Sequence, residues 1–337
     1  MRTYRHLIGI IFTAWIFVGK AQDVHFSQYY FSPLSLNPAN TGNYDGDYRF
    51  FVNYRSQWKE IGEAYDTYSA GGDFNFFPGG INCSGGFLVL NDRSGGNLNV
   101  TKILPSFAIH HSLGGFNFHG GIQPGFVIKT IDFYQNTYPN QLNWTTGQFD
   151  NSLPNMESNV SQRFSFLDLN AGAAISKRFG KFEPELGYSW FHLNRPKESF
   201  LQNNNSRLPI RQAANLMLRL YAGKRLILEG HSMYGFTSEV SDWVSGLNVE
   251  IIFRQNPLYK NSVFFGAMWR SGLERNPDAG ILTAGLHYEK YTFGFSYDVT
   301  LSQLKTSVDM KGAFEIAIIY KAFNNRLQKR EINCERF

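Results

Sequence analysis

The stretch Tyr291-Thr-Phe-Gly-Phe-Ser-Tyr-Asp-Val-Thr-Leu-Ser302 decides the fold, because large apolar residues occupy every odd position and small or polar residues every even one. This period of two predicts a β-strand, since successive side chains of a strand point to opposite faces of the sheet. One face of this strand therefore meets an apolar environment and the other a polar one. A length of about 12 residues exceeds the common strand length of soluble domains but suits a tilted strand that crosses a bilayer.

The same alternation recurs along the chain in about fourteen segments, an even number of the kind that single-chain outer-membrane barrels use. We expect strands at 47–56, 66–76, 81–91, 99–110, 117–131, 163–177, 181–192, 208–221, 224–235, 244–254, 261–271, 279–288, 291–302 and 312–321. Even-numbered connections are short, such as Phe179-Gly180 and Glu289-Lys290, and odd-numbered ones are longer, such as 132–162 and 193–207. Because outer-membrane barrels place short turns and termini in the periplasm and long loops outside, the fold class predicted is an all-β, antiparallel transmembrane barrel.

The two faces of the predicted strands differ in charge. The outward candidates, such as Leu167, Leu247, Phe265 and Ile316, include no charged residue, as a lipid-facing surface requires. The inward faces collect charges of both signs, and the lumen candidates are Asp73, Lys129, Asp168, Glu183, Glu185, Arg219, Glu229, Glu250, Arg254, Arg270, Asp298 and Glu315. Mixed signs favour pairing across a filled or plugged lumen over an open ion-selective pore.

The beginning of the chain predicts export. Residues 1–21 combine Arg2 and Arg5 with an apolar run at 7–18 and with small residues before Gln22, which is the pattern of a secretory signal peptide. The formal charge of +5 falls to +5 − 3 = +2 once the three basic residues of this leader are removed, so charge gives no support for nucleic-acid binding. No later apolar run reaches the ~18 residues of a helical span, so a membrane location requires a closed barrel.

These patterns divide the chain into four parts. We expect a signal peptide at 1–21, an irregular segment at 22–46, the barrel at 47–322 and a periplasmic tail at 323–337. The segment at 22–46 contains two proline steps and no sustained alternation, so we expect it to be irregular and extended, which suits either a plug of the lumen or a segment that docks on a partner in the periplasm.

No motif in the sequence predicts catalysis. It contains no Gly-x-Ser-x-Gly, His-Glu-x-x-His, Walker or Cys-x-x-Cys pattern, so we expect no enzyme, no cofactor and no metal site. Metal binding by inward histidines is a less favoured alternative to hydrogen bonding within the lumen, and it concerns His119, His231 and His287. Cys83 and Cys334 both fall toward the periplasmic side, and a disulfide between them stays open because the distance between their Cα atoms decides it.

Two groups of motifs resemble a known family. The opening Asp23-Val-His-Phe-Ser-Gln-Tyr-Tyr-Phe-Ser-Pro-Leu-Ser-Leu-Asn-Pro-Ala-Asn-Thr-Gly42 and Tyr54-Arg-Ser-Gln-Trp58 resemble the signature of the PorP/SprF family of outer-membrane proteins. The closing Ser296-Tyr-Asp-Val-Thr-Leu-Ser-Gln-Leu304, Phe314-Glu-Ile-Ala-Ile-Ile-Tyr320 and Cys334-Glu-Arg-Phe337 are similar as well, except that Glu335 replaces the usual proline of the tail. The family-motif residues are Phe26, Ser27, Gln28, Tyr29, Pro33, Asn37, Pro38, Gly42, Tyr54, Arg55, Ser56, Gln57, Trp58, Cys334, Arg336 and Phe337.

The resemblance implies a non-enzymatic role in the type IX secretion and gliding machinery of the Bacteroidota. It implies as partners a large surface adhesin with a type B C-terminal domain, components of the periplasmic secretion ring and peptidoglycan-linked proteins, besides the outer-membrane lipid. The long loops, such as 132–162 and 193–207, would face the secreted substrate. The alternative is a plugged transporter for hydrophobic small molecules, which would need an apolar cleft behind its plug.

Overall fold

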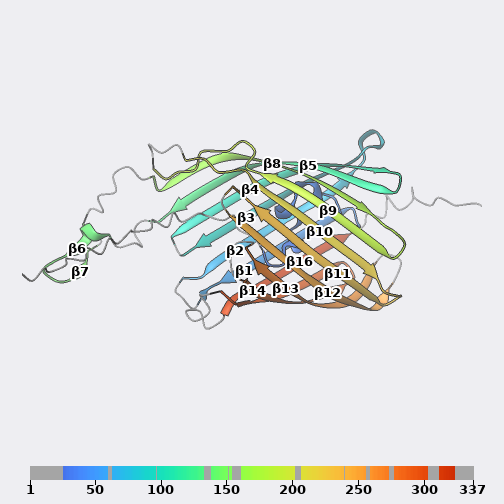
Figure 1. Ribbon diagram of the computed structural model, residues 1–337. Helices are drawn as coiled ribbons and strands as arrows, with labels where there is room; N and C mark the ends of the chain where they lie inside the picture. The colour runs from blue at the N-terminus through green and yellow to red at the C-terminus, as the bar shows by residue number, and fades with distance from the viewer. Residues whose placement is uncertain are drawn as a thin grey trace, which may run out of the picture.

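The computed structural model describes residues 26–59, 63–95, 97–132, 138–150, 152–153, 161–201, 206–238, 240–255, 259–272, 277–302 and 311–322. Within these ranges, fourteen strands form one closed antiparallel barrel, as the sequence predicted (Figure 1). Each barrel strand pairs with its neighbours in the chain, and the first strand closes the barrel by pairing with the last, from Tyr48 opposite Ala322 to Gln57 opposite Ala313. The described part of the chain contains no helix that is both long and apolar enough to cross a membrane.

The observed strands agree with the predicted segments to within about three residues. The barrel strands are β1 (Tyr48–Gln57), β2 (Tyr65–Phe76), β3 (Asn82–Ser94), β4 (Leu98–Leu113), β5 (Phe116–Ile131), β8 (Arg163–Lys177), β9 (Phe182–Phe191), β10 (Arg211–Tyr221), β11 (Leu226–Phe236), β12 (Ser241–Gln255), β13 (Lys260–Ser271), β14 (Pro277–Tyr288), β15 (Tyr291–Thr300) and β16 (Lys311–Ala322). The prediction missed a small hairpin outside the barrel, formed by β6 (Leu142–Asn143) and β7 (Gln148–Phe149).

Strand β15 shows why alternation predicted the faces. Phe295, in the middle of the strand, is 48% exposed on the outer surface, and Asp298 is fully buried on the inner one. The strand ends two residues earlier than expected. Leu301 still donates in register to the carbonyl of Asp278, but the N–H of Ser302 donates to that same carbonyl and does not extend the pairing. The exposed apolar face continues around the barrel, for example at Ile316 on β16, and this surface is the one that lipid covers.

The two rims differ in the way that the sequence predicted. The β4–β5 turn is only two residues long, and Gly114 and Gly115 both adopt positive φ there, which favours glycine. At the other rim the connection between β5 and β8 carries the β6–β7 hairpin, which projects away from the barrel in Figure 1. Tight turns and short connections therefore gather at one end, which we call the short-turn rim, and the loops gather at the long-loop rim.

The N-terminal segment lies inside the barrel, where Figure 1 shows it as the blue coil. It forms a short 3₁₀ helix at Tyr29–Phe31, the helix α1 at Pro33–Leu36 and a second 3₁₀ helix at Pro38–Asn40. Its apolar side chains join the barrel's interior core, where Phe31 and Leu34 pack with residues of several strands. We call residues 26–46 the plug.

A charge on the outer face should weaken the fold. Phe295→Arg is expected to lower the free energy of unfolding in lipid vesicles by about 2–4 kcal/mol, because the side chain lies near the middle of its strand and of the hydrocarbon layer. Tyr291→Arg, at the end of the same strand, should cost at most about 1 kcal/mol. Urea titration of the refolded barrels measures both, and equal losses for the two variants would contradict the lipid-facing assignment.

Candidate functional site

The plug takes its shape from its own sequence. Proline occupies the first position of α1 and of the second 3₁₀ helix, where its missing N–H costs nothing and its fixed φ suits the turn. Between them, the side chain of Asn37 accepts a hydrogen bond from the N–H of Ala39 and caps the second helix. These short helical turns, separated by capping residues, fold the segment compactly. It therefore fills the lumen without pairing with the strands of the sheet.

The first plug residues are bound by a four-charge cluster on the barrel wall, made of Arg55, Arg270, Asp298 and Glu315. The Glu315 carboxylate accepts the backbone N–H of Ser27 at 2.6 Å and that of Gln28 at 2.9 Å. Arg55 donates to Glu315 at 2.5 Å, and Arg270 donates to Asp298 at 2.9 Å. All four side chains are buried and their charges cancel, so the cluster avoids the cost of an unpaired buried charge.

This cluster also sets the direction of the plug. Arg55, Asp298 and Glu315 lie in the parts of β1, β15 and β16 that adjoin the long loops. The plug therefore starts in the long-loop half of the lumen and runs toward the short-turn rim, where β1 begins. Residues 26–46 therefore lie inside the lumen. This differs from the second alternative for the segment at 22–46, in which it docks only in the periplasm.

A second charged contact holds the other end of the plug. Asp73 of β2 accepts the N–H of Gly42 at 2.7 Å. Its carboxylate also forms a bidentate ion pair with the guanidinium of Arg49, with nitrogen–oxygen distances of 2.9 and 2.6 Å. Arg49 also donates to the carbonyl of Asn40 at 2.9 Å. Both ends of the plug are thus bound through its backbone by buried charges of the wall.

Hydrogen bonds and a ring contact hold the middle of the plug. Gln123 of β5 donates to the carbonyl of Leu34 and Ser189 of β9 donates to that of Leu36, both at 3.0 Å. Tyr30 stacks on His231 with ring centroids 4.5 Å apart, and it accepts a hydrogen bond from Asn248. Burial raises the pKa of the Tyr30 phenol well above its usual range, so this side chain stays neutral.

Two inward glycines make room for the plug. A Cβ at Gly121 of β5 would collide with the backbone of Pro38 and Ala39, and a Cβ at Gly172 of β8 would collide with the Asn37 side chain. The neighbouring Gly120 points the other way, and a Cβ there would meet nothing within 4 Å. The barrel wall therefore fits the shape of the plug closely at these two positions.

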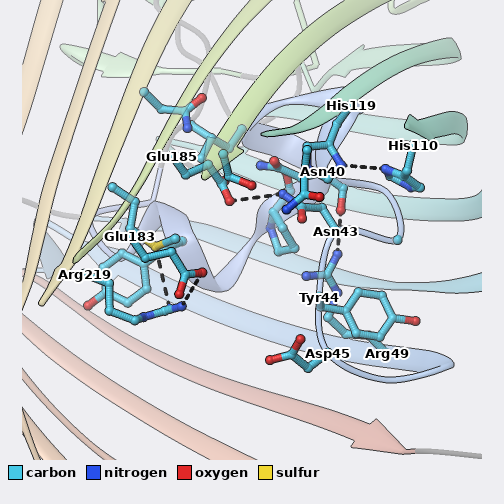
Figure 2. Close-up of a pocket in the computed structure, with 18 of the residues that line it drawn as sticks. Asn40, Asn43, Tyr44, Asp45, Arg49, His110, His119, Glu183, Glu185 and Arg219 are labelled. Atoms are coloured by element: carbon cyan, nitrogen blue, oxygen red, sulfur yellow. Dashed lines mark hydrogen bonds and ion pairs between the residues drawn. The ribbon is translucent and has the colours of Figure 1, made fainter. Parts of the chain in front are cut away.

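Beside the plug lies a pocket of about 470 Å³ (Figure 2), and several of the residues that line it, such as Asn82 and Ser112, lie near the short-turn rim. Its labelled side chains are polar or charged, and they come from the plug and from strands on opposite sides of the lumen. Asn43 donates to Glu185 at 3.2 Å, and the imidazoles of His110 and His119 share a hydrogen bond of 2.7 Å. The described residues include no group of three or more His, Cys, Asp or Glu that could hold a metal ion.

The other predicted lumen charges form separate pairs around the wall. Asp168 binds His192, Lys129 binds Glu198 in the loop after β9, and Glu250 binds Lys260. Arg219 lies between Glu229, at 2.7 Å, and Glu183, at 3.7 Å. Arg254 was placed wrongly: it is exposed at the end of β12, because the register of β12 and β13 shifts between Ile252 and Arg254.

Sequence reasoning gave Arg55 only as a family-motif residue and missed Arg49 as a lumen charge. Both follow from alternation, because Phe50, Val52 and Tyr54 between them point outward. The other motif residues of this strand have local roles. Tyr54 donates to Asp66, Ser56 is buried, Gln57 accepts from Arg55, and Trp58 packs on Tyr65 with a positive φ.

The tail motif lies outside the described residues. It comprises Cys334, Arg336 and Phe337, so neither its position nor its pairing with Cys83 is tested. The predicted leader at 1–21 lies outside them as well.

Weakening the four-charge cluster should loosen the plug. Glu315→Gln leaves Arg55 with one carboxylate partner fewer and replaces one of the two oxygens that accept plug amides with an NH2 group, a change that typically costs about 3–5 kcal/mol. We expect a clear rise in single-channel conductance in planar bilayers, with the barrel still folded. Arg93→Gln, an exposed position at the long-loop rim, is the control and should conduct like the parent.

A larger side chain at Gly121 should displace the plug from the lumen through steric overlap, without any change in charge. Gly121→Val is expected to expose the plug to protease and raise conductance, because its side chain meets backbone that cannot move aside. Gly120→Val is the matched control, since it adds the same volume to the outer face. Identical protease patterns for the two variants would contradict the close fit of plug and wall.

Comparisons with known proteins agree with this geometry. None of the curated proteins matches the sequence. The fold is similar to the toluene transporter TbuX of Ralstonia pickettii, with a TM-score of 0.50, 11% identity, and coverage of 87% of this chain and 94% of that one. It is also similar to the CymD monoaromatic hydrocarbon channel, with a TM-score of 0.50, 9% identity, and coverage of 87% and 93%.

At these identities, the likeness establishes the barrel fold alone. The family comparison reaches further, because residues 18–320 match the family described as type IX secretion system membrane protein PorP/SprF. That match includes the plug, the four-charge cluster and every described strand except the last two residues of β16. The chain therefore belongs to the PorP/SprF family of type IX secretion system membrane proteins, and its barrel is one of the outer membrane.

Proposed function

We propose that this protein is a non-enzymatic module of type IX secretion that supports the export and surface anchoring of large adhesin-like substrates with type B C-terminal domains. The observation that carries the proposal is the occupied lumen. The plug is bound at both ends by buried charges and in the middle by side chains of three strands. A protein with its lumen filled in this way acts through contacts at its two rims.

The long-loop rim offers a contact for a secreted substrate. Trp144, in the turn of the β6–β7 hairpin, is 86% exposed, and Phe149 and Leu153 beside it are exposed too. Neighbouring exposed apolar side chains on an outlying hairpin are typical of surfaces that bind another protein. We propose that this hairpin touches the substrate and that the short-turn rim faces the periplasmic ring and the peptidoglycan-linked proteins.

The remaining parts of the proposal rest on the family membership and on the predicted signal peptide. The proposal also includes export by an N-terminal signal peptide, an origin in the Bacteroidota, a part in gliding motility and the absence of catalytic activity. No described cluster of side chains supports an enzymatic reaction better than it supports hydrogen bonding within the lumen.

A hairpin variant tests the substrate contact. The double variant Trp144→Ser, Phe149→Ser should reduce recovery of the surface adhesin with the barrel by about tenfold, because it removes two exposed apolar anchors. Recovery of ring components should be unchanged. The measurement is quantitative mass spectrometry of complexes purified from native outer membranes.

The matched control is Thr145→Ser, Thr146→Ser, which changes the same turn without removing an apolar group. The proposal would be wrong if both double variants held the adhesin equally, or if the parent purified as a monomer without secretion components.

The rival function is a plugged transporter for hydrophobic small molecules. The fold likeness to TbuX and CymD supports it. The pocket beside the plug does not, because charged and amide side chains such as Glu183, Glu185 and Asn215 line it. Aliphatic or aromatic molecules bound inside the lumen, in the pocket beside the plug, would favour the transporter.

A further inference from the structure

The short-turn rim carries an uneven charge. Three connections on one side of it, between β8 and β9, β10 and β11, and β14 and β15, present exposed basic residues. These residues, which we call the basic arc, are Arg178, Lys181, Lys224, Arg225 and Lys290. The connection between β12 and β13 lies within the same arc and adds the exposed Arg254 at its edge.

The basic arc has little negative charge near it. None of its five residues forms an ion pair with another described residue, and Glu289 is the one acidic residue in the described parts of these connections. By contrast, the β2–β3 and β4–β5 turns on the other side of the rim contain no charged residue. Five basic residues against one acidic residue on one side of one rim create a local positive potential that attracts an anionic surface.

Exposed aromatic side chains lie at the same level as the basic arc. They are Phe179, Phe182, Tyr288 and Tyr291, which stand beside the basic residues in the chain at the ends of β8, β9, β14 and β15. Arg178 also lies over the ring of Tyr221, at 4.5 Å from its centroid. Aromatic rings next to cations mark the level where the hydrocarbon of a bilayer meets its headgroups.

We propose that the basic arc is a binding site for anionic phospholipids of the periplasmic leaflet, with headgroup phosphates held by the arc and acyl chains lying on the outer face of β8 to β11. The outer face there is apolar, with exposed Leu186 and Leu220 below the rim. Guanidinium and ammonium groups bind phosphate oxygens directly, and each basic residue near an anionic membrane surface adds to the attraction. The apolar, uncharged turns on the other side of the rim lack such groups.

A lipid fits this arc better than an acidic protein does, because the aromatic and aliphatic side chains that flank the cations point outward from the barrel. A protein docked from the periplasm would cover the turn tips and leave those side chains in contact with lipid. A phospholipid satisfies both groups, since its phosphate meets the cations and its chains cover the apolar face.

Native mass spectrometry of the purified full chain tests the site, with phosphatidylglycerol or phosphatidylcholine added in detergent. The variant Arg178→Gln, Lys181→Gln, Lys224→Gln, Arg225→Gln should lose bound phosphatidylglycerol by about tenfold or more. The parent should hold phosphatidylglycerol in preference to phosphatidylcholine. Heat-dependent gel migration confirms that each variant is folded.

The matched control moves the same change to the other rim. Arg93→Gln, Arg163→Gln, Arg195→Gln, Lys197→Gln removes four exposed charges among the long loops and should bind phosphatidylglycerol like the parent. Equal lipid loss in both variants, equal lipid retention in both, or no preference of the parent for the anionic lipid would overturn the proposal. Loss of a co-purifying acidic protein from the first variant, with lipid retained, would overturn it in favour of protein docking.

Discussion

The rest of the interior depends on the hydrogen bonds of the Glu315 carboxylate. This group accepts two consecutive backbone N–H groups of the plug and a hydrogen bond from the guanidinium of Arg55. Inside a barrel, every charge must be paired or solvated, because burying it alone costs several kcal/mol. Arg55 and Arg270 neutralise Glu315 and Asp298, and the plug uses the hydrogen-bonding capacity that these carboxylates have left. The interior is therefore polar and occupied at once.

The outside of the barrel obeys the opposite constraint. The bilayer offers no hydrogen bonds, so the strands must satisfy all their backbone groups by pairing, and the pairing of β1 with β16 leaves no open edge. The side chains on that face have only to be apolar, which is why many different residues occupy it. The fold likeness to hydrocarbon transporters at about 10% identity reflects this tolerance, and the interior distinguishes this protein from the general architecture.

Much of the molecule could be predicted from the sequence. Alternation located the barrel strands, because one face must be apolar for lipid and a shift by one residue would reverse the faces. It also identified inward charges such as Asp73, Asp298 and Glu315. It failed at Arg254, where a register shift interrupts the period of two, and at the β6–β7 hairpin, whose strands of two residues are too short to show a period.

The sequence by itself determined a membrane barrel of the PorP/SprF family with two unlike rims and charges inside, because periodicity and motifs are local properties of the chain. Only the tertiary structure decided that residues 26–46 fill the lumen, that they run from the long-loop half toward the short-turn rim, and which charges bind them. The contact between Ser27 and Glu315 joins residues 288 positions apart, and no local pattern encodes which inward carboxylate meets which amide. Barrel closure brings them together, since it places β1, β15 and β16 side by side around the plug.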